Sequence, residues 1–533
     1  MKLRPAIGIV ALVIALVAAQ LVLRAMDKEY CLTQLTMAIY YAIVVIGLCF
    51  IMGYAGQVSL GHGAFFAIGG YTTAVLTTYD FSRFETAAWG RALKQAHVFV
   101  VRQDMYGSDV LNAAPWAAFV TAMAATLVIA VLIGYPALRL KGHYLTMATL
   151  GFGLIVYKII LGSTLTGTTD GIVGVPAWSF GTVAAISGKS AARVQNYYIA
   201  CGIALLVLVL LRNLVRSRVG RALRAIHDHE TAANAMGINT ARYKLKAFVA
   251  SALLAALAGV LGAPISTLEA VTLTLLVFNA YAAPVMGRLK SVPLTFLGAI
   301  VLGLAQSYVS SFVKAGDSNV LERAMSSFER TTGWTLANLQ TAMPAIVLFI
   351  VMLFIRPDRQ RSHSLSTTRD QFRVPTWRVT LIGAVLFPVA TIMLTVIVPD
   401  TFQLSLAGGY ALALITLSLV PLAGYSGQIS LAQMSFAGIG AVVMGNVGAN
   451  NPVLGLVAAV AVAAVVGALV SLPALRLSGI YLALLTASFA LMLSKLVLSQ
   501  QKVMPQGNLA VPALSDAWNT ATARIIVSAV AFT

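Results

Sequence analysis

Few polar side chains interrupt the long apolar stretches of this sequence, and three of them lie in one glycine-rich segment, Gly53–Phe66. Gln57 and Ser59 can exchange hydrogen bonds with a polar solute or with backbone groups that a helix break sets free. His62 can do the same or carry a proton. Because small residues also permit close packing of helices, the segment suits a pathway and a helix junction about equally.

The segment Gly53–Leu60 (GYAGQVSL) returns later in the chain as Gly424–Leu431 (GYSGQISL). The polar pair is kept as Gln428 and Ser430, so both pairs and the histidine are candidate pathway residues. The histidine itself is replaced by Gln433 in the second copy. This replacement favours hydrogen bonding over proton carriage at that position.

The most basic part of the chain is the stretch 212–246. Within it, residues 220–237 have the helical spacing of an amphipathic segment, with Leu223 and Ile226 on the apolar face and Gly237 as a C-cap. A short helix of this kind can dock on another protein or lie on anionic lipid, and composition alone leaves both alternatives open.

The elements that must position these motifs are membrane helices. The chain has 533 residues, of which 59% are hydrophobic and only 10% charged, whereas a soluble domain carries about 25% charged residues. Apolar runs of about 20 residues, the length of a helical span, recur along the chain. The fold class is therefore all-α, a polytopic transmembrane helical bundle with about 10 spans in the first part and about 6 in the rest. In the first part they lie near 5–24, 31–52, 57–78, 117–138, 143–162, 196–212, 246–264, 270–287, 293–313 and 340–355.

Basic loops assign the two sides of the membrane. With the N-terminus in the cytoplasm, every basic cluster falls on the same side, including 212–246, whereas the mixed-charge loop 80–116 falls outside. The formal net charge of +19 is thus explained by cytoplasmic loops, and we expect no nucleic-acid partner. The lipid bilayer is expected to surround the spans. Asp170, in an outer segment, is expected to stabilise a turn.

Two further motifs recur in the same order as the first. Pro136–Leu145 returns as Pro473–Leu482, and the Asp170-Gly171 to Val175-Pro176 segment returns with Gln506-Gly507 and Val511-Pro512. We therefore predict a permease-sized module at 1–355, a basic cytoplasmic linker at 356–378 and a partial second copy, parallel to the first, at 379–533. The second copy is expected to be a half-module or the start of a longer one.

Several classes of protein are disfavoured. No GxxxxGK[ST] phosphate loop occurs, and the spans hold no cluster of His, Cys, Asp or Glu, so neither ATP hydrolysis, nor a metal site, nor an enzyme activity is expected. An ion- or proton-driven secondary transporter is the alternative function. Such a carrier needs ionisable residues within its spans, and Lys158 is the main candidate.

Four ordered motifs resemble the permeases of branched-chain amino-acid ABC importers: Gly53–Phe66 (GYAGQVSLGHGAFF), Ala137–Tyr144 (ALRLKGHY), Thr166–Pro176 (TGTTDGIVGVP) and Gly220–Ile238. The last resembles the family's coupling loop through its glycine, basic and alanine residues. The resemblance covers about 30–310 and, in the second copy, about 405–512. Its expected coupling residues are Gly220, Arg221, Arg224, Ala225, Glu230, Ala233 and Gly237.

The resemblance implies a transport subunit in a bacterial inner membrane that holds no cofactor of its own. Two ATP-binding subunits on separate chains would hydrolyse ATP, with Arg221 and Arg224 against them and Ala225 and Ala233 allowing close approach. An extracytoplasmic binding protein would deliver the substrate, and a second permease subunit or the second copy would complete the pathway. Which amino acid or related solute is carried stays open at this stage.

Overall fold

The computed structural model describes most of the chain. The described residues are 4–25, 29–84, 88–103, 109–140, 143–180, 184–269, 292–314, 336–354, 376–397, 399–428, 430–449, 451–477, 480–500, 503–504, 523, 525–527 and 529. The chain divides into two compact units, Met1–Ala315 and Gly316–Thr533. Each unit is described by itself. The predicted span 270–287 lies outside the described residues. Of the predicted linker 356–378, only residues 376–378 are described.

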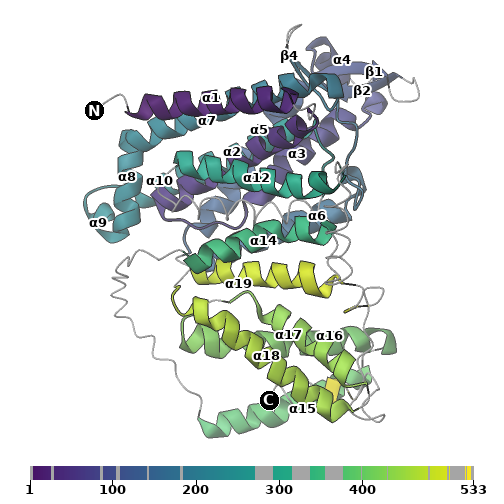
Figure 1. The fold of residues 1–533 in the computed structure, drawn as a ribbon. Helices are drawn as coiled ribbons and strands as arrows, with labels where there is room; N and C mark the ends of the chain where they lie inside the picture. Colours follow the sequence, from purple (N-terminus) through teal and green to yellow (C-terminus); the bar gives the residue numbers. More distant parts are fainter. Residues whose placement is uncertain are drawn as a thin grey trace. The chain divides into compact units, whose positions relative to one another are not determined.

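The first unit is built from long apolar helices and a few short elements (Figure 1). Its α-helices are α1 (Arg4–Ala25), α2 (Cys31–Ala55), α3 (His62–Thr78), α4 (Ala88–Gln95), α5 (Pro115–Ala137), α6 (His143–Gly162), α7 (Arg193–Arg216), α8 (Arg218–Asp228), α9 (Glu230–Ala235), α10 (Thr240–Gly262) and α12 (Val292–Lys314). Its 3₁₀ turns are η1 (Ser82–Phe84), η2 (Thr164–Thr166) and η3 (Ser190–Ala192).

The centre of the first unit is α2, which is apolar on every face. In its most apolar 18-residue stretch, 89% of the residues are buried, as expected for a helix without a polar side. It packs against α7, α10 and α12, while α3 packs against α10 and α5. The N-terminal helix is tied to this core by a hydrogen bond from the Tyr197 hydroxyl of α7 to the Leu16 carbonyl, 2.8 Å long.

Helices α3 and α10 approach each other closely enough for backbone contact. A Cβ on Gly69 would lie 2.4 Å from the Ala256 carbonyl oxygen, and one on Gly259 would lie 2.0 Å from the Phe66 carbonyl oxygen. Small residues at such positions allow membrane helices to make dense van der Waals contact, which is the main attraction available to them in lipid. The pair α3–α10 is therefore fixed by glycines on both helices.

The short elements of the first unit gather at its two ends. Figure 1 shows α8 and α9 at one end and α4, β1, β2 and β4 at the other. Strands β1 (Phe99–Gln103) and β2 (Asp109–Ala113) form an antiparallel hairpin, as do β3 (Trp178–Phe180) and β4 (Ala184–Ile186). The basic stretch and the mixed-charge loop 80–116 thus lie at opposite ends of the bundle. The sequence did not predict strands in that loop.

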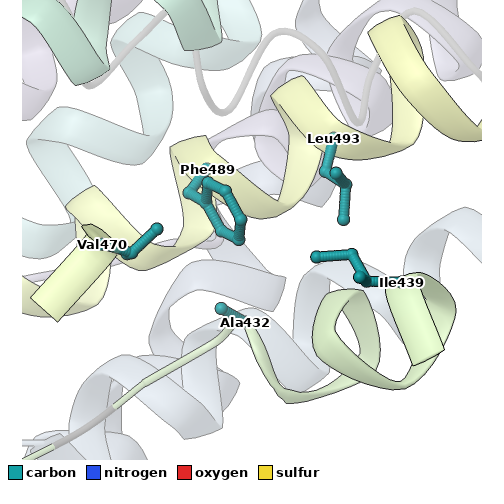
Figure 2. Packing of buried hydrophobic residues seen from close by; sticks show 5 residues of the cluster. All are labelled: Ala432, Ile439, Val470, Phe489 and Leu493. Carbon is teal, nitrogen blue, oxygen red and sulfur yellow. The ribbon is translucent and has the colours of Figure 1, made fainter. Parts of the chain in front are cut away.

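The second unit contains α14 (Leu336–Phe354), α15 (Trp377–Ile397), α16 (Asp400–Leu417), α17 (Gln433–Val447), α18 (Pro452–Ala474) and α19 (Ile480–Leu493), with π-helical segments η4 (Val420–Tyr425) and η5 (Ser494–Leu498). Figure 2 shows its core, where Phe489 and Leu493 of α19 face Ile439 of α17 and Val470 of α18. A short turn joins α17 to α18, since α17 ends at Val447 and α18 begins at Pro452.

Helices thus dominate the structure, as predicted. Within the described residues, eight are long and apolar enough to cross a membrane, and the chain is a multi-pass α-helical membrane protein. Two predicted boundaries were wrong: the third span begins at His62 rather than near 57, and the span predicted from near 246 begins at Thr240. Residues 56–61 are not helical, because the segment turns between α2 and α3.

Candidate pathway motif and coupling segment

The first glycine-rich segment forms the junction between α2 and α3. Helix α2 ends at Gly56, whose φ of 65° is a left-handed conformation that favours glycine. The backbone N–H groups of Gly56 and Gln57 both donate to the Ile51 carbonyl and so close the helix. The chain then runs without helix to His62, which begins α3. The predicted helix break is therefore present.

The junction is held from the side by α6. The Leu60 N–H donates to the Thr149 hydroxyl over 3.0 Å, and a Cβ on Gly61 would lie 2.9 Å from the Thr149 carbonyl oxygen. Thr149 is fully buried. One side chain thus satisfies a backbone donor that the helix break leaves free, which a low-dielectric site requires.

The three candidate pathway residues of this copy are all buried. Gln57, Ser59 and His62 have 3%, 1% and 2% of their surface exposed. The His62 Nε2 lies 2.6 Å from the Ser251 hydroxyl of α10, whereas both polar atoms of the Gln57 amide lack a hydrogen-bond partner within the described residues. A buried amide of this kind is a candidate contact for a solute or water.

The second glycine-rich segment, Gly424–Leu431, repeats the same backbone interactions. Gly427 has a φ of 64°, and the Gln428 N–H donates to the Leu422 carbonyl over 3.0 Å. The Leu431 N–H donates over 3.0 Å to the hydroxyl of Thr486, on α19. The surroundings differ, because Gln428 is exposed and Ser430 half-buried. The structure therefore brings Gln57, Ser59 and His62 together in one buried junction. Gln428 and Ser430 lie at a junction that is more exposed.

The basic stretch forms two short helices rather than the single helix predicted over 220–237. Helix α8 begins at Arg218, with the Ser217 hydroxyl accepting from the Val219 N–H as N-cap, and it ends at Asp228. His229 is extended, and α9 follows. Asp and His favour helix interiors less than the preceding Ala and Leu residues, and the break falls at this polar pair.

The apolar face of α8 is turned into the protein. Leu223 is fully buried and Ile226 is 3% exposed, and α8 packs against α2, α7 and α10. A helix that lies on lipid would present this face to the membrane. The apolar face of α8 therefore contacts protein in this structure, and its polar face is the exposed one.

Gly220 lies inside α8 and not before it, as the sequence had suggested. A Cβ on Gly220 would lie 2.1 Å from the Val215 carbonyl oxygen, so only glycine lets α7 and α8 meet at this corner. Ala233 of α9 is also buried, at 4% exposure. These two predicted coupling residues serve the internal packing of the segment in this structure.

The other predicted coupling residues lie at the surface. Arg221, Arg224 and Ala225 are exposed on α8. The guanidinium of Arg224 donates to the carbonyls of Gly220 and Val215 and so covers the α7–α8 corner. The exposed face of α8 is thus basic, with a small residue at its centre.

Helix α9 is fixed at both ends. The half-exposed Glu230 carboxylate forms an ion pair with Lys244 of α10, with 2.6 Å between Oε1 and Nζ. At the other end Gly237 has a φ of 82°, and the N–H groups of Gly237 and Ile238 donate to Asn234 and Ala233, which is the expected glycine C-cap. The segment is therefore braced against α10.

The segment 218–237, which we call the coupling segment after its predicted role, touches the glycine-rich segment Gly53–Phe66 directly. A Cβ on Gly56 would lie 2.6 Å from the His227 Nδ1 of α8. The imidazole thus lies against the backbone at the point where α2 ends. Sequence reasoning missed His227, Thr149 and Ser251, since their roles depend on contacts between distant segments. His227 lies within the recognised motif Gly220–Ile238, whereas Thr149 and Ser251 lie outside the recognised motifs and carried no signal in the sequence.

Comparison with known proteins defines the class of this bundle. The family model described as "Branched-chain amino acid transport system / permease component" matches residues 30–356. The chain therefore belongs to this family of transport permeases.

Individual relatives agree with the family match. The high-affinity branched-chain amino acid transport system permease protein LivM of Salmonella typhimurium is 32% identical over 245 residues, which cover 42% of this chain and 50% of that protein. The LivM of Escherichia coli K12 is 31% identical over the same shares. The LivH of Salmonella typhimurium is 23% identical over 297 residues, 54% of this chain and 88% of that protein. The chain thus spans half the length of the LivM proteins. No solved structure matches significantly.

Proposed function

We propose that this chain is the membrane-spanning permease subunit of an ATP-driven importer for branched-chain amino acids. The relatives are named as branched-chain amino acid transport system permeases, and the substrate class is carried over from those names. ATP would be hydrolysed by two separate ATP-binding subunits. An extracytoplasmic binding protein would deliver the substrate, and a second permease subunit would complete the pathway. The chain itself would need no cofactor and would act in a bacterial cell membrane.

The observation that carries this proposal is the orientation of α8. Its apolar residues Leu223 and Ile226 are buried, while Arg221, Arg224 and Ala225 face outward. A basic surface with a small residue at its centre suits close approach by a protein that presents acidic or carbonyl groups. Basic loops also favour the cytoplasmic side, where ATP-binding subunits would be found. The N-terminus would then be cytoplasmic too.

A rigid path leads from this surface to the junction of α2 and α3. Force applied to α8 reaches Gly56 through the His227 ring, and α9 is braced on α10 by the pair of Glu230 and Lys244. Helix α10 in turn bonds to His62 through Ser251. A shift of α8 and α9 would therefore move both sides of the junction that holds Gln57. We propose that this junction opens and closes the pathway.

The test uses Ala225→Trp, because a bulky residue there blocks docking without entering the protein interior. Gly220 is less suitable, since its substitution would disrupt the α7–α8 corner. The matched control is Val173→Trp, at an exposed position in the predicted outer segment. In vesicles with the ATP-binding subunits and binding protein, we expect Ala225→Trp to reduce leucine uptake per ATP hydrolysed at least tenfold, and the control to keep it. If Ala225→Trp left leucine uptake per ATP hydrolysed unchanged, α8 would not be the coupling element.

A further inference from the structure

An open pocket of about 500 Å³ lies in the second unit, beside the second copy of the glycine-rich segment. We call it the η4–α17 pocket. It is lined by Ser418, Pro421, Leu422, Ser426, Gln433 and Phe436. These residues come from the end of α16, from η4 and its C-terminal flank, and from the start of α17.

Each lining residue has a counterpart in the first unit, because the two segments align without a gap from Gly47 and Ser418 onward. The counterparts are Gly47, Phe50, Ile51, Ala55, His62 and Phe65. All of them are buried. Helix α10 covers this face, since it packs on both α2 and α3. The pocket therefore occupies the place in the second unit that α10 fills in the first.

The contacts of α10 in the first unit show what fills the place. A Cβ on Gly47 would lie 3.3 Å from both the Leu254 Cβ and the Ser251 Oγ. The ring centroids of Phe65 and Phe248 are 5.6 Å apart, in an edge-to-face arrangement. One helix thus supplies an aromatic, a hydroxyl and an aliphatic side chain in two turns.

The polar contact is the most informative one. In the first unit, His62 bonds to the Ser251 hydroxyl. In the second unit its counterpart, Gln433, has an Oε1 atom that is buried yet has no hydrogen-bond partner within the described residues. An unpaired buried polar atom destabilises a structure, so this atom calls for a donor. A hydroxyl at the position of Ser251 would supply it.

Backbone spacing gives a second, independent observation. Gly69 faces the Ala256 backbone of α10, and a Cβ on Gly69 would lie 2.4 Å from the Ala256 carbonyl oxygen. Its counterpart Gly440 is also glycine, yet a Cβ there would meet nothing within 4 Å. The second unit thus keeps a small residue at the site of closest helix approach, without a helix against it in the described structure.

We propose that the η4–α17 pocket is the seat of a transmembrane helix with the chemistry of α10. This helix carries a hydroxyl side chain that donates to Gln433, and small residues one and two turns later that approach Gly440. Lipid chains would leave the Gln433 amide unpaired. The chain's own α10 is held in the first unit by backbone contact with α3. The inference rests on the correspondence of the two segments and not on the proposed transport activity.

Disulfide trapping in liposomes of phosphatidylethanolamine and phosphatidylglycerol tests the proposal. The full chain carries Ser418→Cys, and a synthetic peptide of residues 240–262 carries Leu254→Cys. These positions are chosen because a Cβ on Gly47, the counterpart of Ser418, would lie 3.3 Å from the Leu254 Cβ. The native cysteines in the described residues are buried, and the unsubstituted chain measures their background. The control chain carries Val460→Cys, an exposed position on α18. We expect at least tenfold more peptide disulfide with Ser418→Cys than with the control.

Three variants make the result specific to the α10 mode of binding. Gly259→Leu in the peptide should abolish trapping, because it fills the site of closest approach. Gln433→Leu in the chain and Ser251→Ala in the peptide should each reduce trapping severalfold, and together no further, since they remove one hydrogen bond. Three results would overturn the proposal: no trapping by a peptide that is helical in the liposomes, equal trapping at Val460→Cys, or disulfides between two copies of the chain in place of the peptide disulfide.

Discussion

The two glycine-rich segments of this chain share a backbone and differ in what covers them. Gly56 and Gly427 have the same left-handed φ, and Leu60 and Leu431 donate to threonines at matching positions of α6 and α19. Only the first segment is enclosed by α10. The local conformation is therefore set by the segment and its threonine, whereas the burial of its polar side chains depends on a helix that arrives from far along the chain.

The largest expected effect concerns the glycines at the closest helix approach. Gly69→Leu should destabilise the first unit by more than the roughly 1–3 kcal/mol of an ordinary overpacked site, because the side chain meets the Ala256 backbone. Gly440→Leu should have little effect, since its side is open. Hydrogen–deuterium exchange of α3, α10 and α17 peptides in purified protein measures both. Equal loss of protection in the two units would contradict the difference in packing.

A smaller effect is expected at the histidine position. His62→Ala leaves the Ser251 hydroxyl without its buried partner, at a cost of about 1–3 kcal/mol. His62→Gln should restore most of that loss, because the second copy carries glutamine at this position. Thermal unfolding in detergent ranks the variants. If His62→Gln proved as damaging as His62→Ala, the position would require an imidazole and the hydrogen-bonding interpretation would be wrong.

The smallest effect should be the same in both copies. Thr149→Val and Thr486→Val each remove one hydroxyl that accepts from a backbone N–H at the helix break. We expect each to cost about 1 kcal/mol and to speed exchange of the Leu60 or Leu431 amide. Amide exchange resolved by residue checks this. An effect confined to Thr149→Val would show that the second segment owes its conformation to something other than α19.

The sequence predicted the elements better than their contacts. The helix break at Gly56 and the C-cap at Gly237 followed from glycine chemistry within a few residues, and the spans followed from uninterrupted apolar runs. The split of the coupling segment at His229 was missed, because weak local preferences decided it. The β1–β2 hairpin was missed because the loop was judged by its charge alone.

The candidate site shows the same limit. Polarity and repetition identified Gln57, Ser59 and His62, but the hydrogen bond from His62 to Ser251 joins residues separated by 189 positions. The sequence also did not predict that Gly220 and Ala233 pack inside the protein. A small residue can allow close approach of a partner or of another helix of the same chain, and the sequence does not distinguish the two. Only the packing of α8 and α9 against the rest of the first unit separates the two cases.

We propose that ATP hydrolysis on partner chains drives transport through this permease. The most direct measurement is uptake of labelled leucine into liposomes that hold the chain, with ATP-binding subunits, binding protein and ATP supplied together or one at a time. We predict accumulation only with the complete set and ATP, and none from a sodium or proton gradient alone. Accumulation driven by an ion gradient in liposomes that lack the ATP-binding subunits would contradict the claim.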